Sequence, residues 1–331
     1  MFPQPAYSDL RDVEIQRCAR VVVETCLDLK PKETVVIVGD THQSLRLELG
    51  LMSAAYSCGA IPTLLISPAA EWLAEEPDPV VAAAMKSADA VLVVNTRSLT
   101  HTSALDEARK AGARVLSAPA MQEDNFLRTT DIDYQELAGR VRKIEKVFKE
   151  GLSFQLTSKS GTNLKGEFGY RVQATDGYCR NPGDFDQLSA GAIGRAPIES
   201  SVEGRIVSEP GRSGLLGVNM GRVEFVIREG RIVEILGESE AKRIKNILEG
   251  YDDPNMFNIA EIGTGANPRA RFTGFPMEDR RMIGAVHIGL GDNQRFFGGK
   301  VKACSHFDMA VLDHTLLING QEIIVDGKLI L

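Results

Sequence analysis

The sequence predicts two domains: an α/β N-terminal domain at residues 1–150, built on a Rossmann-like parallel sheet, and an α+β domain at residues 151–331, rich in antiparallel strands. Three observations lead to this fold class. The length of 331 residues exceeds what one hydrophobic core usually fills. The first half alternates short apolar runs with helical patterns, which is typical of a parallel sheet. The second half has short alternating strands and many glycines.

In the first half, four short runs rich in β-branched residues predict buried strands, and the stretches around them have helical periodicity. No GxGxxG motif follows the first run, so the sequence does not favour a nucleotide site. We expect strands at 33–40, 60–67, 89–95 and 113–119, and helices at 44–59, 102–112 and 131–151.

In the second half, alternating apolar and polar residues predict antiparallel strands joined by tight turns. Glu229-Gly230 and Asn319-Gly320 lie between such runs and favour hairpin turns. We expect strands within 154–161, 222–237, 285–291 and 313–331, and one helix at 239–251.

Composition narrows the class of protein. Hydrophobic residues make up 43% and charged residues 25%, as in ordinary soluble globular proteins. A net charge of -7 and a pI near 5.4 argue against a nucleic-acid or anionic-membrane partner. No apolar run is long enough for a membrane span, and the start has no features of a secretory signal. Five cysteines without a CxxC pair favour reduced thiols, so we expect a cytoplasmic protein.

The stretch KACSHFDMAVLDH (302–314) places a histidine and an aspartate two residues apart in a strand-like context. Side chains alternate along a strand, so His306 and Asp308 should face the same point. His314, at the start of the next strand, is predicted to be structural.

A short internal repeat adds two more polar residues. IAEIGTGAN (259–267) and AVHIGLGDN (285–293) place Glu261 and His287 at equivalent positions, each on an apolar segment that we expect to break into a glycine turn. Each of these residues alone could be an ordinary core or surface residue. If the polar side chains were buried together without a partner, however, their charges would cost roughly several kcal/mol of folding free energy. A bound cation would compensate all of them. The sequence therefore predicts one divalent metal ion (Zn, Co, Mn or Fe(II)) bound by Glu261, His287, His306 and Asp308.

The runs AEIGTGANPRA, HIGLGDN and GGKVKACSHFDM resemble the thermophilic metallo-aminopeptidases of the aminopeptidase T and S type. The resemblance implies that Glu261 and His287 match a metal-binding glutamate and histidine of that family. It also implies that His306 and Asp308 match the family's His-x-Asp ligands.

The chain departs from that family at two positions. Members bind two metal ions through five ligands, and the first ligand is a glutamate in the stretch that here reads LSAGAIGRAP, where Ala192 takes its place. A second metal is therefore doubtful. A tyrosine thought catalytic in the peptidases is Gln294 here.

The chain also resembles a second branch of the same superfamily, the 2,5-dihydroxypyridine 5,6-dioxygenases. The stretches GDFDQLSAGAIGRAPIESSVEG and YDDPNMFNIAEIGTGANPRARFTG have close counterparts there. Those enzymes hold one iron(II) by two histidines and an aspartate, and they too lack the first glutamate. They carry a histidine at the place of Glu261 and lack the one at His287.

The main functional prediction is an aminopeptidase-like metallohydrolase that acts on small peptides or amides, with Glu261 activating water. The alternative is a mononuclear Fe(II) ring-cleaving dioxygenase, in which His287, His306 and Asp308 form a facial triad. A metal-free binding protein with a relic site is a third reading. We expect a homodimer with a small-molecule or short-peptide substrate. Four arginines near the ligands could bind a substrate carboxylate or form a solvated basic face: Arg269, Arg271, Arg280 and Arg281.

Overall fold

The computed structural model describes residues 7–71, 75–100, 102–211, 213–215, 218–219 and 221–331. The chain divides into two compact units, and each is described by itself. The first consists of Met1–Tyr134 and Thr175–Ala190, and the second of Gln135–Ala174 and Gly191–Leu331. The predicted fold class is confirmed, because the first unit has a parallel five-stranded α/β sheet and the second has a large antiparallel sheet.

These units divide the chain differently from the predicted domains at 1–150 and 151–331. Helix α6 (Tyr134–Glu150) falls almost wholly in the second unit, and a later segment, 175–190, returns to the first. The return has a clear cause, since β7 (Phe185–Gln187) adds to the first sheet beside β4 (Arg114–Ser117). The domain division itself stays a prediction.

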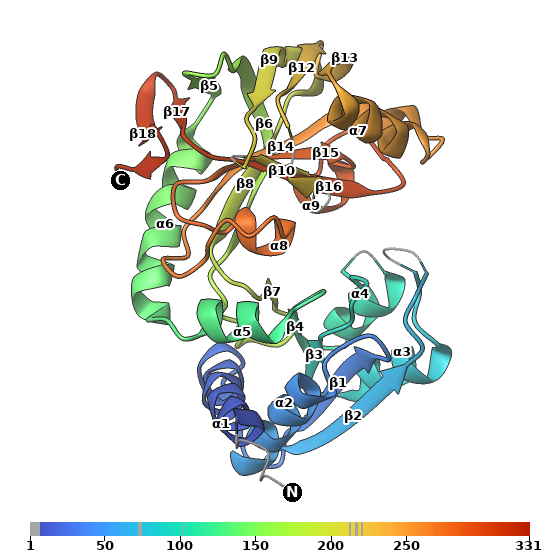
Figure 1. The fold of residues 1–331 in the computed structure, drawn as a ribbon. Helices are drawn as coiled ribbons and strands as arrows, with labels where there is room; N and C mark the ends of the chain where they lie inside the picture. The colour runs from blue at the N-terminus through green and yellow to red at the C-terminus, as the bar shows by residue number, and fades with distance from the viewer. Residues whose placement is uncertain (1–6, 72–74, 101, 212, 216–217, 220) are drawn as a thin grey trace, which may run out of the picture. The chain divides into compact units, whose positions relative to one another are not determined.

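The first unit is a sheet of order β2-β1-β3-β4-β7 in which every neighbouring pair is parallel (Figure 1). The predicted strands and the helices α2 and α4 are present within a few residues. Helices α1, α3 and α5 were not predicted. The elements are α1 (Tyr7–Arg20), a π-helical turn (Val21–Cys26), β1 (Thr34–Asp40), α2 (Leu45–Ser57), β2 (Ile61–Ser67), α3 (Pro79–Ser87), β3 (Ala90–Val93), α4 (Ser103–Lys110), β4, α5 (Glu123–Thr130) and β7.

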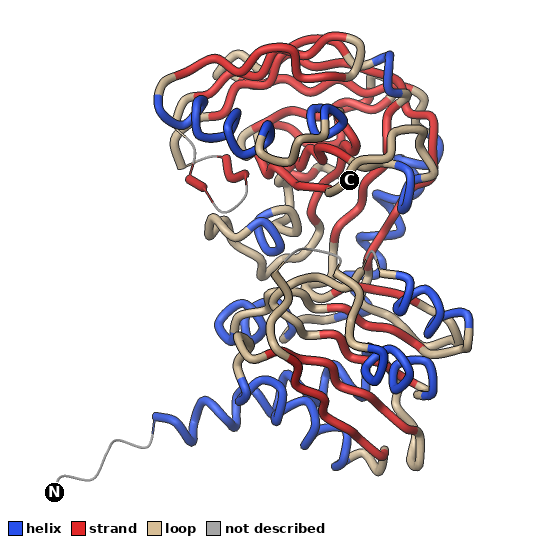
Figure 2. The backbone as a smooth tube through the Cα atoms, turned by 90° about the vertical axis from the view of Figure 1, so that its right-hand side faces the viewer, coloured by secondary structure: helices blue, strands red, loops and turns tan. Residues whose placement is uncertain are grey.

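The second unit is built on a 14-stranded sheet, and it has more strand than helix (red and blue in Figure 2). Its main path runs β11-β10-β16-β15-β14-β8-β6-β5-β17-β18-β19, and β9, β12 and β13 branch from β6. Its strands are β5 (Ser153–Ser158), β6 (Asn163–Thr175), β8 (Ala192–Pro197), β9 (Glu203–Ser208), β10 (Ser213–Leu215), β11 (Val218–Asn219), β12 (Val223–Arg228), β13 (Arg231–Gly237), β14 (Ile259–Gly265), β15 (Val286–Gly291), β16 (His306–Val311), β17 (His314–Ile318), β18 (Gln321–Val325) and β19 (Lys328–Leu329).

The second unit has few helices besides α6, and its hairpins form where the sequence predicts them. Glu229 and Gly230, between β12 and β13, have φ values of 47° and 73°. Asn319 and Gly320, between β17 and β18, have φ values of 52° and 78°. Two successive positive φ values give the turn whose twist suits a hairpin. The helices are α7 (Ser239–Glu249), α8 (Pro276–Asp279) and α9 (Gln294–Phe297), with 3-10 turns at Glu199–Ser201 and Pro254–Phe257.

Strands β8, β14, β15 and β16 are consecutive neighbours, and their two faces differ sharply. Cross-strand partners share a face, so the pairing register sorts the side chains. The face away from the candidate ligands carries Ile193, Ile262, Ile288 and Met309, all fully buried. The other, which we call the site face, carries Ala192, Gly194, Glu261, Gly263, Gly265, His287, Gly289, Gly291, His306, Asp308 and Ala310.

Arg195 on β8 attaches helix α6 to the sheet. Its Nη1 donates to the carbonyl oxygens of Phe148 at 2.7 Å and Gly151 at 2.8 Å, and its Nε donates to that of Tyr170 at 2.6 Å. The last carbonyls of a helix have no partner within the helix, and a cation there is doubly favourable. This contact explains why α6 packs with the second unit.

Two further predictions concern the whole chain. No helix in the described part is both long and apolar enough to cross a membrane. All five cysteines are free in the structure.

Replacing Arg195 with alanine should destabilise the second unit. We expect the free energy of unfolding to fall by about 2 kcal/mol, because carbonyl oxygens at the end of α6 lose a charged donor. Urea unfolding followed by circular dichroism measures the change. Arg205→Ala is the matched control, since Arg205 is 58% exposed and pairs with Glu224 across neighbouring strands. It should shift stability by less than about 0.5 kcal/mol, and an equal loss in both variants would contradict the assigned role.

Candidate metal centre

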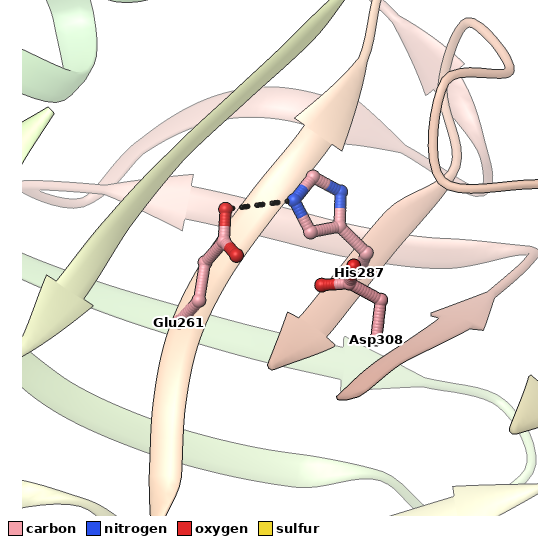
Figure 3. A group of neighbouring side chains, drawn as sticks. All are labelled: Glu261, His287 and Asp308. Carbon is pink, nitrogen blue, oxygen red and sulfur yellow. Dashed lines mark hydrogen bonds and ion pairs between the residues drawn. The ribbon is translucent and has the colours of Figure 1, made fainter. Parts of the chain in front are cut away.

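The internal repeat of the sequence forms two neighbouring antiparallel strands. Glu261 on β14 pairs with Gly289 on β15, and His287 on β15 pairs with Gly263 on β14. Each polar residue of one repeat therefore lies opposite a glycine of the other. Gly289 in turn pairs with Asp308 on β16, so three adjacent strands bring Glu261, His287 and Asp308 together on the site face (Figure 3).

The four predicted side chains come together in the structure. His287 Nε2 is 3.1 Å from Glu261 Oε1, and His306 Nε2 is 3.4 Å from both Glu261 Oε2 and Asp308 Oδ1. His306 and Asp308 thus face one point, as strand alternation predicts. Donor atoms of Glu261, His287 and Asp308 all lie within 4.8 Å of one another, which is a possible metal site.

Glycines make the room for this group. A Cβ on Gly194 would lie 1.6 Å from Oε1 of Glu261, and one on Gly263 would lie 2.2 Å from Nε2 of His287. A Cβ on Gly289 would lie 2.7 Å from both Cβ of Glu261 and Cε1 of His306. Glu261, His287 and His306 therefore rest directly on the backbone of the sheet.

The orientation of His306 is fixed from outside the group. Its Nδ1 is 2.7 Å from the carbonyl oxygen of Asp292, which can only accept, so Nδ1 carries a proton and donates it. The other ring nitrogen, Nε2, then faces the carboxylates. A histidine that binds a metal through one nitrogen commonly donates the other to a carbonyl in this way.

The electrostatics of the group favour a cation. Burial alone would raise the pKa of the Glu261 carboxyl, but His287 and His306 outweigh burial and lower that pKa to about 2. Burial likewise opposes ionisation of Asp308, and the nearby Arg280 and His306 hold its pKa well below the ordinary range. Burial would lower the pKa of His306, yet its contacts with the carboxylates of Asp308 and Glu261 raise it to about 10. The two carboxylates are thus ionised and draw positive charge into the group.

Two buried polar atoms of the group have no hydrogen bond: Nδ1 of His287 and Oδ1 of Asp308. The 3.4 Å from the latter to His306 Nε2 is long for a hydrogen bond. Unpaired buried polar atoms are rare and call for an explanation, such as an ion. Two imidazoles and two carboxylates are borderline donors that suit Fe(II), Mn, Co or Zn. The residues therefore fit a divalent metal ion.

The four arginines predicted to bind substrate have different surroundings. Arg280 reaches the group, with Nη1 2.7 Å from Oδ2 of Asp308. Arg281 is fully buried and donates from Nη1 to the carbonyl oxygen of Met277 at 2.8 Å. Arg269 and Arg271 are exposed. No contact with a substrate tests these assignments, and they stay predictions.

Ala192 lies on the site face, paired with Gly265, two residues along β8 from Gly194. Its methyl group offers no metal ligand where the peptidase resemblance implies a glutamate. Gln294 begins α9, outside the four strands. His314 takes no part in the group, because it is buried between the carbonyl oxygen of Leu312, 2.6 Å from Nδ1, and Thr162 Oγ1, 3.0 Å from Nε2.

Sequence reasoning missed the glycines' role. The repeats were expected to break into glycine turns, but Gly263 and Gly289 lie inside strands β14 and β15. The signal was present, since each glycine follows its polar residue by two and therefore shares its face. The role of the Asp292 carbonyl had no signal, because any residue type supplies one.

Comparison with known proteins bears on this site. A model of the 2,5-dihydroxypyridine 5,6-dioxygenase (NicX) family matches residues 14–331. A 2,5-dihydroxypyridine 5,6-dioxygenase from Pseudomonas putida is 28% identical over 261 residues, which are 75% of this chain and 72% of the relative. A solved 2,5-dihydroxypyridine dioxygenase from Pseudomonas putida KT2440 has a TM-score of 0.85 at 22% identity, over 96% of this chain and 97% of that chain. AmpT from Thermus thermophilus has a TM-score of 0.71 at 15% identity, over 96% and 99%.

These findings correct the main predictions from sequence. Assignment to the metallo-aminopeptidases was wrong, and so was the aminopeptidase-like hydrolase derived from it, because the family match covers nearly the whole chain whereas AmpT shares the fold at low identity. The error arose from giving most weight to Glu261 and His287, two positions on a fold that both groups share. Over nearly its full length, the chain belongs to the 2,5-dihydroxypyridine 5,6-dioxygenase family.

Proposed function

We propose that this protein is a mononuclear Fe(II) dioxygenase that cleaves the ring of a dihydroxypyridine or a closely related dihydroxylated aromatic compound. The observation that carries the proposal is the buried group of two imidazoles and two carboxylates on the site face, in a chain of this family. The substrate class follows from the family and is a small molecule.

The proposed ligands are His287, His306, Asp308 and Glu261. Three strands hold them, and the ring of His306 is held in place by the hydrogen bond from its Nδ1 to the Asp292 carbonyl oxygen. Bound Fe(II) would supply open coordination positions at which O₂ and the substrate's oxygens are brought together. The protein's part is to fix the ligands and to keep water out of a group whose Glu261 and His287 are 5% and 0% exposed.

Glu261 has a second possible task besides binding the ion. Its carboxylate is ionised and lies between the two histidines, with Oε1 3.1 Å from His287 and Oε2 3.4 Å from His306. A carboxylate in this position can accept a hydroxyl proton from an aromatic substrate. We propose ligand as its main role and general base as its second.

A single metal ion agrees with the site face. A hydrolytic pair of ions needs ligands for both, clamped about 4 Å apart. Ala192 occupies the face beside Gly265 and contributes no donor. A single ion with open positions suits a redox reaction with O₂ better than it suits a two-metal hydrolysis.

The proposal predicts oxygen consumption. Protein reconstituted anaerobically with Fe(II) should consume O₂ when 2,5-dihydroxypyridine is added, with loss of the ring's ultraviolet absorbance. His306→Ala should lose bound iron and turnover together, because it removes a ligand and two ion-pair contacts with the carboxylates. An oxygen electrode and elemental analysis measure the two quantities.

His314→Ala is the control for that experiment. His314 is also a buried histidine, but it is hydrogen-bonded elsewhere and lies outside the group. It should keep its iron content even if it is less stable. Equal iron in wild type and His306→Ala, or no oxygen uptake with any dihydroxypyridine, would contradict the proposal.

The glycines give a test that leaves every ligand in place. Gly194→Ala puts a methyl group where Oε1 of Glu261 lies, so Glu261 must move and metal affinity should fall by about tenfold or more. Gly139→Ala, on α6, is the control because nothing lies within 4 Å of the added atom. Calorimetric titration with Mn²⁺ measures both variants. Unchanged affinity in Gly194→Ala would exclude Glu261 as a ligand.

We also propose a homodimer, whose contact surface includes β2. In the described part of the chain this strand has a neighbour on one side only, and Ile61 and Ile66 on it are 56% and 46% exposed. Edge strands with exposed apolar residues favour pairing with another chain. Light scattering should give twice the chain mass of 36.1 kDa. Ile66→Lys should shift the protein to monomer, whereas Val233→Lys, at an exposed position of the second unit, should not.

A further inference from the structure

Arg280 is part of the electrostatic environment of the candidate centre. Its Nη1 lies 2.7 Å from Oδ2 of Asp308, and the two side chains are only 13% and 10% exposed. Charges this close and this buried are poorly screened by water and salt. A guanidinium has no lone pair to offer a metal, so Arg280 cannot be a ligand. It must act through Asp308 or on whatever binds beside it.

The backbone fixes the place of Arg280, because both its neighbours in sequence are fully buried. Asp279 Oδ1 accepts a hydrogen bond from the backbone N–H of Thr273 at 2.7 Å, and Arg281 Nη1 donates to the carbonyl oxygen of Met277 at 2.8 Å. Arg280 therefore has a fixed backbone position beside the centre and is not a mobile surface side chain.

The net charge of the ion and its ligands indicates what Arg280 contributes. Two histidines and one carboxylate around a divalent ion leave one net positive charge, and such a centre attracts an anion. Here Glu261 adds a second carboxylate, which would bring the ion and its ligands to neutrality. Arg280 returns one positive charge at the edge of the group, at a distance that still matters in a buried site.

We propose that Arg280 offsets the charge of the second carboxylate, Glu261, so that the centre binds its aromatic substrate as an anion. This inference rests on the proposed function and adds the charge state of the substrate that the site selects. It makes Arg280 a specificity-determining residue. In the same geometry, Arg280 engages Oδ2 of Asp308 and leaves Oδ1, which has no hydrogen bond, facing the group.

A purely structural role for Arg280 predicts the opposite effect on metal binding. If Arg280 only holds Asp308 in place, its loss should weaken metal affinity by about 10–100-fold, as losses of groups that orient ligands commonly do. If it offsets charge, its loss removes a repulsion of the cation, so metal affinity should stay the same or increase. The affinity for an anion should then fall, by about tenfold or more, since a charged partner is lost.

The test uses the full chain loaded with Zn²⁺, which has no redox chemistry and permits no turnover. Wild type, Arg280→Gln and Arg280→Lys are compared in three titrations. A competing chelating dye gives the Zn²⁺ affinity, the absorbance of 4-nitrocatechol reports binding of an anionic ring, and calorimetry with imidazole reports a neutral ligand. Arg205→Gln is the matched control, because Arg205 is 58% exposed and pairs with Glu224 outside the site face. Circular dichroism checks that each variant is folded.

We expect Arg280→Gln to keep its Zn²⁺ and imidazole affinities and to bind 4-nitrocatechol about tenfold or more weakly. Arg280→Lys, which keeps the charge, should recover most of the difference, and Arg205→Gln should match wild type. Equal nitrocatechol binding in Arg280→Gln and wild type would overturn the inference, as would a loss of Zn²⁺ with no selective loss of the anion. Failure of wild type to bind Zn²⁺ would instead contradict the proposed function, and this inference with it.

Discussion

The candidate centre depends on the absence of side chains. Four ionisable groups lie on one face of a sheet whose neighbouring strands are about 4.8 Å apart, so they fit only where adjacent positions carry nothing larger than hydrogen. Gly194, Gly263 and Gly289 provide this, and a Cβ at any of them would overlap Glu261, His287 or His306. The register of β8, β14, β15 and β16 is therefore as much a part of the site as the ligands. A slip of one residue would turn every ligand to the opposite face.

The opposite face of the same strands resists such a slip. Ile193, Ile262, Ile288 and Met309 are fully buried there, so each strand has an apolar side that fixes which way it lies. Because the opposite face supplies the apolar packing, the site face can be polar. Burying several charges costs much free energy unless each is paired with an opposite charge. Here imidazoles and Arg280 lie next to the carboxylates of Glu261 and Asp308. The apolar face provides the stability that a group of charges on the site face cannot.

Much of this arrangement could be predicted from the sequence, and what could not has identifiable causes. Strand alternation is local, so the convergence of His306 and Asp308 followed from their spacing alone. The internal repeat identified Glu261 and His287, which share one face of the sheet because each pairs with a glycine of the other repeat. The addition of β7 to the first sheet could not be foreseen, since it depends on a return of the chain over a long separation. The same holds for the contact of Arg195 with α6, for which residue type gives no warning.

The choice between chemistries was beyond local reasoning for a different reason. Hydrolytic and oxygenase sites on one fold use the same kinds of ligand, so Glu261 and His287 are compatible with either, and a fold does not determine a function. Only the pattern of the whole chain distinguished the two families. What the residues do settle is the number and balance of charges. Ala192 removes a donor from one side of the site face, and Arg280 adds a cation on the other. Both features agree with the proposed single ion and anionic substrate rather than with a clamp for two ions.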